Sequence, residues 1–236
     1  NDFGSVDSGV VEVKVYDFSP IHVKGLIGWF DANDTATVLN ENNFISKWLD
    51  KSNSKNNFYQ DIPNNMPVFS NNGIVFDGVN DSLGLETAIS ESSVSVIYIK
   101  KSSDTKSLDF VGQSSQEYVF VSQSGSTSNV FNDFGSPQTY VNGDLKNFAN
   151  RSQVYDAVHD AQLNLVSIMH GNSSSWSEFN IGNYSSYEFD GSFSEIIFLQ
   201  GLVSFETKSR VEGYLAHKWG LTANLPANHP YKNTAP

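Results

Sequence analysis

The sequence predicts an all-β fold, a two-sheet antiparallel jelly-roll sandwich with one C-terminal α-helix. Aromatic residues make up 13% of the 236 residues, with 17 Phe and 10 Tyr, and such residues are enriched in strands. Short apolar runs are separated by Gly, Asn, Ser and Asp, and helical periodicity is confined to one segment. Many short strands joined by turn residues are typical of sandwiches.

Residues 1–24 are expected to form an N-terminal arm or attachment strand. Residues 1–9 are polar and rich in Gly and Ser, whereas Val11, Val13 and Val15 alternate with polar residues as in a half-buried strand. A strand of this kind can add to the sheet of a neighbouring molecule. The predicted sandwich occupies residues 25–236 as one domain, because no repeat or interior linker divides the chain.

The strands of the sandwich are predicted from apolar runs bounded by turn residues. The first covers residues 25–32. From there to about residue 70 the chain is rich in Asn and Ser, which predicts long surface loops held by buried aromatic side chains. Further strands are predicted at 73–76, 82–85, 94–99, 118–121, 163–169, 179–181 and 193–199.

One helix is predicted near the C-terminus. Ser204 is a suitable N-cap, and Val211, Leu215 and Trp219 fall on one helical face. Gly220 follows, where a left-handed residue commonly ends a helix. The Pro-containing tail beyond it is expected to lie extended on the surface.

Composition limits the classes of partner. The chain has 26 Asp and Glu against 14 Lys and Arg, a net charge of −12, which excludes nucleic acid as an expected partner. No apolar run reaches the length of a membrane span, so membrane insertion is not expected. Cysteine is absent. The expected location is extracellular or on a virion surface, and the expected partners are glycans or assembly partners, a homo-oligomer among them.

Three segments carry a family resemblance. Residues 25–34 with 45–52, which include a W-x-D-x-S turn, residues 75–83, and residues 193–231 together resemble the concanavalin A-like lectin/glucanase superfamily. The nearest likeness is to the laminin-G-like modules of bacterial surface and phage structural proteins. The resemblance implies a jelly roll of two antiparallel sheets. It implies no particular ligand, because this fold carries lectins, hydrolases, adhesins and structural parts.

Carboxylates are the first candidates for catalysis. A glycoside hydrolase needs two carboxyl groups facing each other across a cleft. The spaced Glu-x-Asp-x-x-Glu run of the laminarinase-like branch is absent, and Glu178, Glu188 and Asp190, which come nearest to it, have the wrong spacing. The sequence therefore predicts no catalytic residues and a protein that is not an enzyme.

Metal binding is a second alternative. Asp77, Asn80 and Asp81 could offer oxygen ligands to Ca²⁺, although Asp and Asn are also the usual residues of tight turns, which is the favoured interpretation. The histidines are scattered without a metal-ligand spacing; they are His22, His159, His170, His217 and His229. No cofactor is expected to be required, and Ca²⁺ is kept as a candidate ligand.

Glycan binding is the third alternative. Sugars stack on aromatic rings and bond to small polar side chains. Trp176, Tyr184 and Tyr187 stand in a Ser- and Asn-rich stretch of this kind and are the candidate carbohydrate-binding residues.

The predicted function is that of a non-catalytic surface module. It is a virion or cell-surface structural or adhesion component, such as a capsid decoration or fibre part, with glycan binding as an additional property. The alternative is a dedicated carbohydrate-binding lectin module, and a glycoside hydrolase ranks third.

Overall fold

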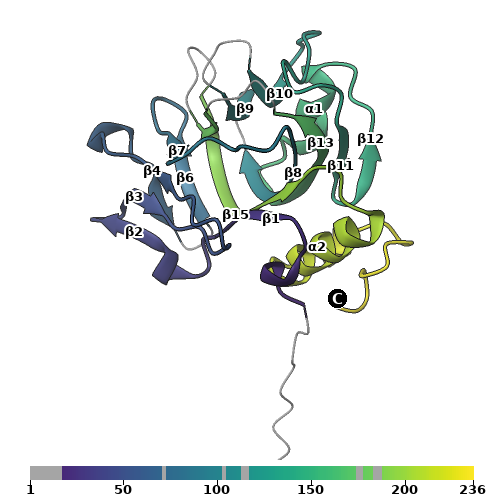
Figure 1. The fold of residues 1–236 in the computed structure, drawn as a ribbon. Helices are drawn as coiled ribbons and strands as arrows, with labels where there is room; N and C mark the ends of the chain where they lie inside the picture. The colour runs from purple at the N-terminus through teal and green to yellow at the C-terminus, as the bar shows by residue number, and fades with distance from the viewer. Residues whose placement is uncertain (1–17, 71–72, 103–104, 113–116, 174–177, 183–187) are drawn as a thin grey trace, which may run out of the picture.

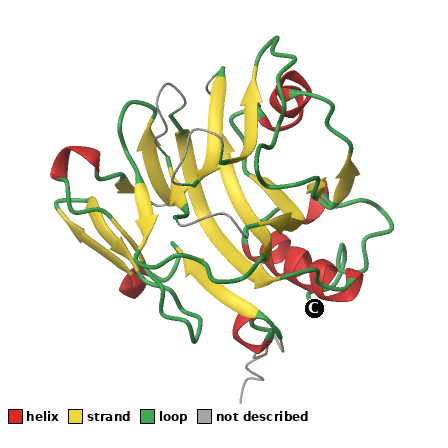
Figure 2. Ribbon diagram, turned by 45° about the horizontal axis from the view of Figure 1, so that its top comes forward, coloured by secondary structure: helices red, strands yellow, loops and turns green. Residues whose placement is uncertain are grey.

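The structure is a computed structural model that describes residues 18–70, 73–102, 105–112, 117–173, 178–182 and 188–236. Its described part is mostly β-sheet with two α-helices (Figures 1 and 2). The strands are β1 (Leu26–Asp31), β2 (Val38–Glu41), β3 (Phe44–Trp48), β4 (Phe58–Tyr59), β5 (Val68–Ser70), β6 (Gly73–Asp77), β7 (Leu83–Leu85), β8 (Ser93–Ser102), β9 (Lys106–Val111), β10 (Tyr118–Gln123), β11 (Gln138–Val141), β12 (Asp144–Lys146), β13 (Asn164–Asn172), β14 (Asn180–Ile181) and β15 (Asp190–Gln200). The helices are α1 (Arg151–Val158) and α2 (Phe205–Lys218), with short 3₁₀ turns η1 (Pro20–His22), η2 (Thr35–Thr37), η3 (Pro63–Asn65) and η4 (Thr222–Asn224).

The strands form one antiparallel sheet that folds over on itself. Its order is β10-β9-β14-β7-β4-β3-β5-β6-β15-β8-β13-β11-β12, with β1 also paired to β15 and β2 to β3. Phe110 of β9 nevertheless packs on Tyr98 of β8 and Phe193 of β15, with ring centroids 5.2 and 5.6 Å apart. Strands far apart in the sheet order therefore face each other. This confirms the predicted all-β sandwich, and hydrogen bonds join its two layers into a single sheet.

An aromatic core fills the space between the layers. Phe30, Trp48 and Phe58 pack against one another there, and all three are buried. Dispersion contacts and edge-to-face ring contacts stabilise the fold in addition to the hydrophobic free energy of burying these side chains. The segment between residues 33 and 70 was expected to be loop, but it contributes β2 to β5 to the sheet. Trp48 and Phe58 are buried, as expected for aromatic residues of this segment, whereas Tyr59 is 42% exposed.

Helix α2 covers the outer face of the sheet, as Figure 1 shows for the helix below β15 and β13. Successive side chains of a strand point to opposite faces. In β8, Tyr98 therefore belongs to the inner core, and Ile97 and Ile99 belong to the cluster with Val211 and Leu215 of α2. Both faces of this strand are buried, which explains its nearly continuous apolar sequence.

The ends of α2 agree with the prediction. The Ser204 hydroxyl accepts a hydrogen bond from the Thr207 N–H at 3.1 Å, and Gly220 has a φ of +73°. The Leu221 N–H then donates to the Ala216 carbonyl at 2.7 Å, closing the helix end. The predicted C-terminal helix is confirmed.

The tail after α2 was expected to lie extended on the surface, but it forms turns and packs onto the helix. Leu225 and His229 are buried. Gly213 makes this packing possible, because a Cβ there would lie 2.4 Å from the Cβ of Tyr231. The His217 Nε2 contacts the Tyr231 carbonyl at 2.9 Å.

A second helix was not predicted. In α1 the Asn150 side chain caps the first turn by accepting from the Gln153 N–H at 3.1 Å, and Val154 and Val158 are buried. Two buried valines in eight residues are too few to show a helical period. His159 is the C-cap of this helix and stacks on Tyr155.

The beginning of the described chain lies against α2. Phe18 is buried, with its ring centroid 5.8 Å from that of Tyr214. The predicted strand at Val11 to Val15 lies outside the described residues. The division into residues 1–24 and 25–236 remains a prediction. None of the described helices has the length and apolar composition needed to cross a membrane.

Candidate ligand groove

A groove of about 660 Å³ opens beside the β2–β3 hairpin, in the part of the sheet drawn at the left of Figure 1. Four separate segments line it: the β2–β3 turn, η3 with the chain that follows it, β5, and the loop between β6 and β7. Its lining residues are Glu41, Asn42, Phe44, Pro63, Asn64, Met66, Val68, Asp77, Asn80 and Asp81. We call it the acidic groove, because three of these residues are carboxylates.

A tight turn builds one wall of the acidic groove. Asn42 and Asn43 have φ values of 53° and 70°, the left-handed conformation that Asn tolerates and that two-residue hairpins need. Phe44 follows, paired across the sheet with Val68 of β5. Phe44 is 49% exposed and Val68 37% exposed, so the wall is apolar and open to solvent.

The β6–β7 loop forms the polar wall. The Asp77 Oδ1 accepts from the Val79 N–H at 2.9 Å and the Asn80 N–H at 3.3 Å. The Asp77 N–H donates in turn to the Asp81 Oδ2 at 2.9 Å. Gly78 between them has a φ of +71°, and a Cβ there would lie 2.8 Å from the Cβ of Asp190. The loop is thus fixed by hydrogen bonds to its own side chains. Its backbone at position 78 takes a conformation that only glycine adopts without strain.

The two aspartates differ in environment. Asp77 is exposed, whereas Asp81 is buried beneath it. Burial, and after it the nearby charge of Asp77, raises the pKa of Asp81 to about 6. Asp81 therefore changes charge within a mildly acidic pH range, at the wall of the groove.

The sequence-predicted metal residues thus share one site. Asp77, Asn80 and Asp81 come together as the polar wall, where the carboxylates of Asp77 and Asp81 bind backbone N–H groups of the loop. In the described part of the chain no three His, Asp or Glu side chains gather in a way that would hold a metal ion. Binding of Ca²⁺ remains a prediction.

The sequence-predicted sugar-binding residues, Trp176, Tyr184 and Tyr187, lie outside the described residues. Phe44 was not singled out, although it is exposed and directly follows an Asn-Asn turn. That dipeptide between β-type residues was the available signal. The groove itself is assembled from four segments, and their meeting could not be seen in the sequence.

The acidic residues considered for hydrolysis lie in different places. Asp190 begins β15 and stands opposite Asp77 in the register of β6 and β15. Glu178 is exposed and accepts from the Asn180 side chain at 3.3 Å. Glu188 precedes β15 and is partly buried.

Two of the histidines contact polar side chains of other elements. His170 Nδ1 and the Ser93 hydroxyl are 2.9 Å apart, and His229 Nε2 lies 3.3 Å from the Glu212 Oε2. His22 lies in η1. These contacts hold strands and tail together.

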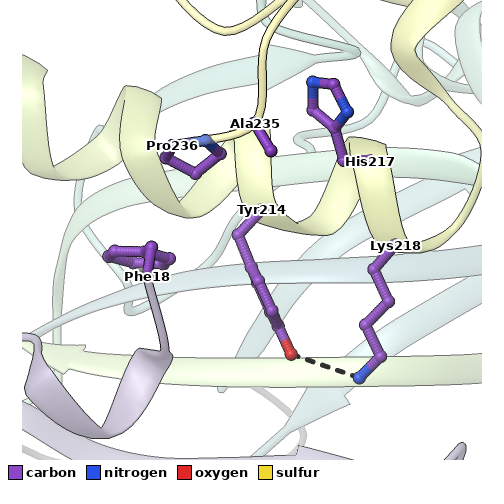
Figure 3. Close-up of a pocket in the computed structure, with 6 residues that line it drawn as sticks. All are labelled: Phe18, Tyr214, His217, Lys218, Ala235 and Pro236. Carbon is purple, nitrogen blue, oxygen red and sulfur yellow. Dashed lines mark hydrogen bonds between the residues drawn. The ribbon is translucent and has the colours of Figure 1, made fainter. Parts of the chain in front are cut away.

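A second concavity, of about 280 Å³, lies between Phe18, α2 and the end of the C-terminal tail. Figure 3 shows Phe18 and Tyr214 on one side and His217 with Ala235 and Pro236 on another. Its lining is mostly apolar, and the Lys218 ammonium that reaches it is bound at 2.7 Å by the Glu195 Oε2 and at 2.7 Å by the Asp31 Oδ1. Its one cation is therefore already paired, whereas the acidic groove keeps exposed polar groups for a ligand.

The comparisons with known proteins concern the fold. No protein-family model matches the sequence, and no curated protein matches it significantly. Among solved structures, the chain resembles a Trypanosoma rangeli sialidase in complex with sialic acid, with a TM-score of 0.50 and 10% sequence identity. The match covers 84% of this chain and 34% of the sialidase chain, so this chain spans about a third of that structure. At this identity the likeness shows the fold alone.

The comparison corrects one prediction. The sequence was interpreted as that of a protein that is not an enzyme, yet a solved structure that resembles it over 34% of its own chain is a sialidase, which is an enzyme. The absence of one carboxylate motif therefore does not show that the chain is not an enzyme. The match assigns no activity to this chain.

Proposed function

We propose that the chain is a surface adhesion module of the concanavalin A-like kind that binds carbohydrate in the acidic groove. One observation carries the proposal: the exposed aromatic residue Phe44 lines the same groove as the polar residues Asn80 and Asp77. Sugar rings have an apolar face that stacks on aromatic rings and hydroxyls that bond to such polar groups. An all-β sandwich with a helix-covered outer face supports the proposed family.

The size of the groove agrees with this ligand class. Small-molecule sites commonly have volumes of about 300–1,000 Å³, and the groove has about 660 Å³. Its polar wall is fixed before any ligand arrives, by the hydrogen bonds within the β6–β7 loop. A preformed wall lowers the entropy cost of binding.

The proposal is tested on a glycan array, followed by calorimetric titration with the glycans that bind. Phe44→Ala is expected to weaken binding by about tenfold or more, since aromatic contacts contribute about 0.5–1.5 kcal/mol beyond the area they bury. Tyr59→Ala is the matched control, because Tyr59 is 42% exposed on the neighbouring strand β4 and does not line the groove. Repeating the titration with a chelator tests the candidate Ca²⁺.

Two results would overturn the proposal. One is an array on which no glycan binds the full chain. The other is equal loss of affinity in Phe44→Ala and Tyr59→Ala, which would place the contact elsewhere.

A further inference from the structure

The charged residues that line the acidic groove are all negative. Its ten lining residues include the carboxylates Glu41, Asp77 and Asp81 and no Lys, Arg or His. Three lysines lie between residues 41 and 81. Lys47 pairs with Glu86, and Lys51 pairs with Asp31 and Asp34, whereas Lys55 does not line the groove. The whole chain adds to this field, since its formal net charge is −12.

A carboxylate of a ligand would find no countercharge in this groove. Anionic sugars are bound in proteins by cations or by several donating N–H groups. Here the backbone N–H groups of Asp77, Val79 and Asn80 already donate to the aspartate side chains of the same loop. The other N–H donors of the lining include the side-chain amides of Asn42, Asn64 and Asn80, which are uncharged. The remaining carboxylate oxygens only accept hydrogen bonds, which suits sugar hydroxyls.

We propose that the acidic groove selects uncharged sugars and rejects sugars that carry a carboxylate, such as sialic acids and uronic acids. This inference rests on the proposed function and names its ligand class. The sialidase of similar fold was solved with sialic acid. The charge of this groove is the wrong one for that ligand, so we expect the two proteins to differ in the sugars they bind.

The test compares neutral and acidic glycans on one array, using N-acetyllactosamine and its sialylated form as the matched pair, and then titrates the full chain with both. The sialylated form is expected to bind about tenfold more weakly or not at all, because like charges at short range repel. Raising the salt concentration should narrow the difference for the unmodified chain.

Variants of unchanged shape test the cause. Glu41→Gln, Asp77→Asn and Asp81→Asn together remove three negative charges and keep the acceptor oxygens of the loop. The control removes three exposed charges that do not line the groove, by Asp144→Asn, Asp156→Asn and Glu206→Gln. Only the groove variant is expected to bind the sialylated glycan as well as the neutral one.

The outcomes separate the two proposals. If neutral and sialylated glycans bind the unmodified chain equally at low salt, the charge selection is wrong and glycan binding stands. If both triple variants gain the same binding, the net charge and not the groove is responsible, which also overturns the inference. If no glycan binds at all, the proposed function fails, and the inference falls with it.

Discussion

The indole Nε1 of Trp29 donates a hydrogen bond to the Oε1 of Glu195 at 2.8 Å, and both side chains are buried. The bond joins β1 to its partner strand β15 on the face that α2 covers. The same carboxylate also accepts from the Trp219 Nε1 at 2.8 Å and from the Lys218 Nζ at 2.7 Å. One buried carboxylate thus fixes the end of α2 to the sheet.

Glu195→Ala should therefore destabilise the fold. The change leaves two indole N–H groups and a half-buried ammonium without this acceptor, and removal of one partner from a buried charge network costs about 3–5 kcal/mol. Chemical denaturation followed by circular dichroism measures the loss. Asp156→Ala is the control, since Asp156 is exposed on α1. Similar unfolding midpoints for the two variants would show that the network contributes little.

A second ion pair lies inside the sandwich. The Lys100 Nζ is 2.5 Å from the Asp109 Oδ1, and Tyr98 donates to the Asp109 Oδ2 at 2.7 Å. Lys100 and Asp109 are completely buried. Asp109→Asn alone should cost about 3–5 kcal/mol, because it leaves the Lys100 charge buried and unpaired.

Replacing that whole group by apolar residues should cost far less. In Tyr98→Phe, Lys100→Met and Asp109→Leu combined, no buried charge remains, and such replacements are often neutral or stabilising. Guanidinium denaturation measures the free energy of unfolding of the single and triple variants. A triple variant as unstable as the single one would show that the pair itself stabilises the core.

Stability should depend on the protonation of Asp81. Its pKa is about 6 in the folded chain against an ordinary value of 3.8, so the folded state holds a proton that the unfolded state has released between these pH values. This contribution to stability is present at low pH and is lost as pH rises from about 4 to about 6. Because solvent reaches the groove, we expect it to be about 1–2 kcal/mol.

Urea denaturation at pH 4, 5, 6 and 7 measures this dependence. Asp81→Asn keeps an acceptor for the Asp77 N–H and should remove the corresponding part of the slope. Asp156→Asn should leave the slope unchanged. An identical slope in all three proteins would mean that Asp81 does not titrate in this range.

Gly213 offers a test of the tail. Ala is the better helix former by about 1 kcal/mol, yet a side chain at this position would collide with Tyr231. Gly213→Ala should therefore destabilise the fold, and adding Tyr231→Gly, which removes the Cβ that the new methyl group meets, should restore part of the loss. Thermal unfolding of both variants checks this, and a more stable Gly213→Ala would show that the tail is not held on α2.

The predictable parts of the fold are those with local signals. Ser204 and Gly220 bracket α2 because capping depends on neighbouring backbone groups, and the longer apolar strands such as β8 and β15 were found at nearly their true positions. By contrast, β2 to β5 are only two to five residues long and are separated by segments rich in Asn and Ser, so this region resembles a series of loops. Their pairing depends on partners elsewhere in the chain.

The candidate site was predictable only in its pieces. Asp77, Asn80 and Asp81 were recognised as turn residues with ligand-type oxygens, and their hydrogen bonds show that turn. Phe44 reaches the same groove through the long-range pairing of β3 with β5. No local rule gives that proximity, because it arises when the whole sheet closes.

Phe18 and Pro236 line the same small concavity beside α2 (Figure 3). Because these two residues lie close together, the segment from Phe18 to Pro236 can be inserted into an exposed loop of a carrier protein without moving the two ends of that loop apart. For the same reason, a short linker from Pro236 to Phe18, in a variant that begins at residue 18, would permit circular permutants. The new termini of such a permutant could be placed at Gly125, in the exposed turn after β10, where an added Cβ would meet nothing within 4 Å.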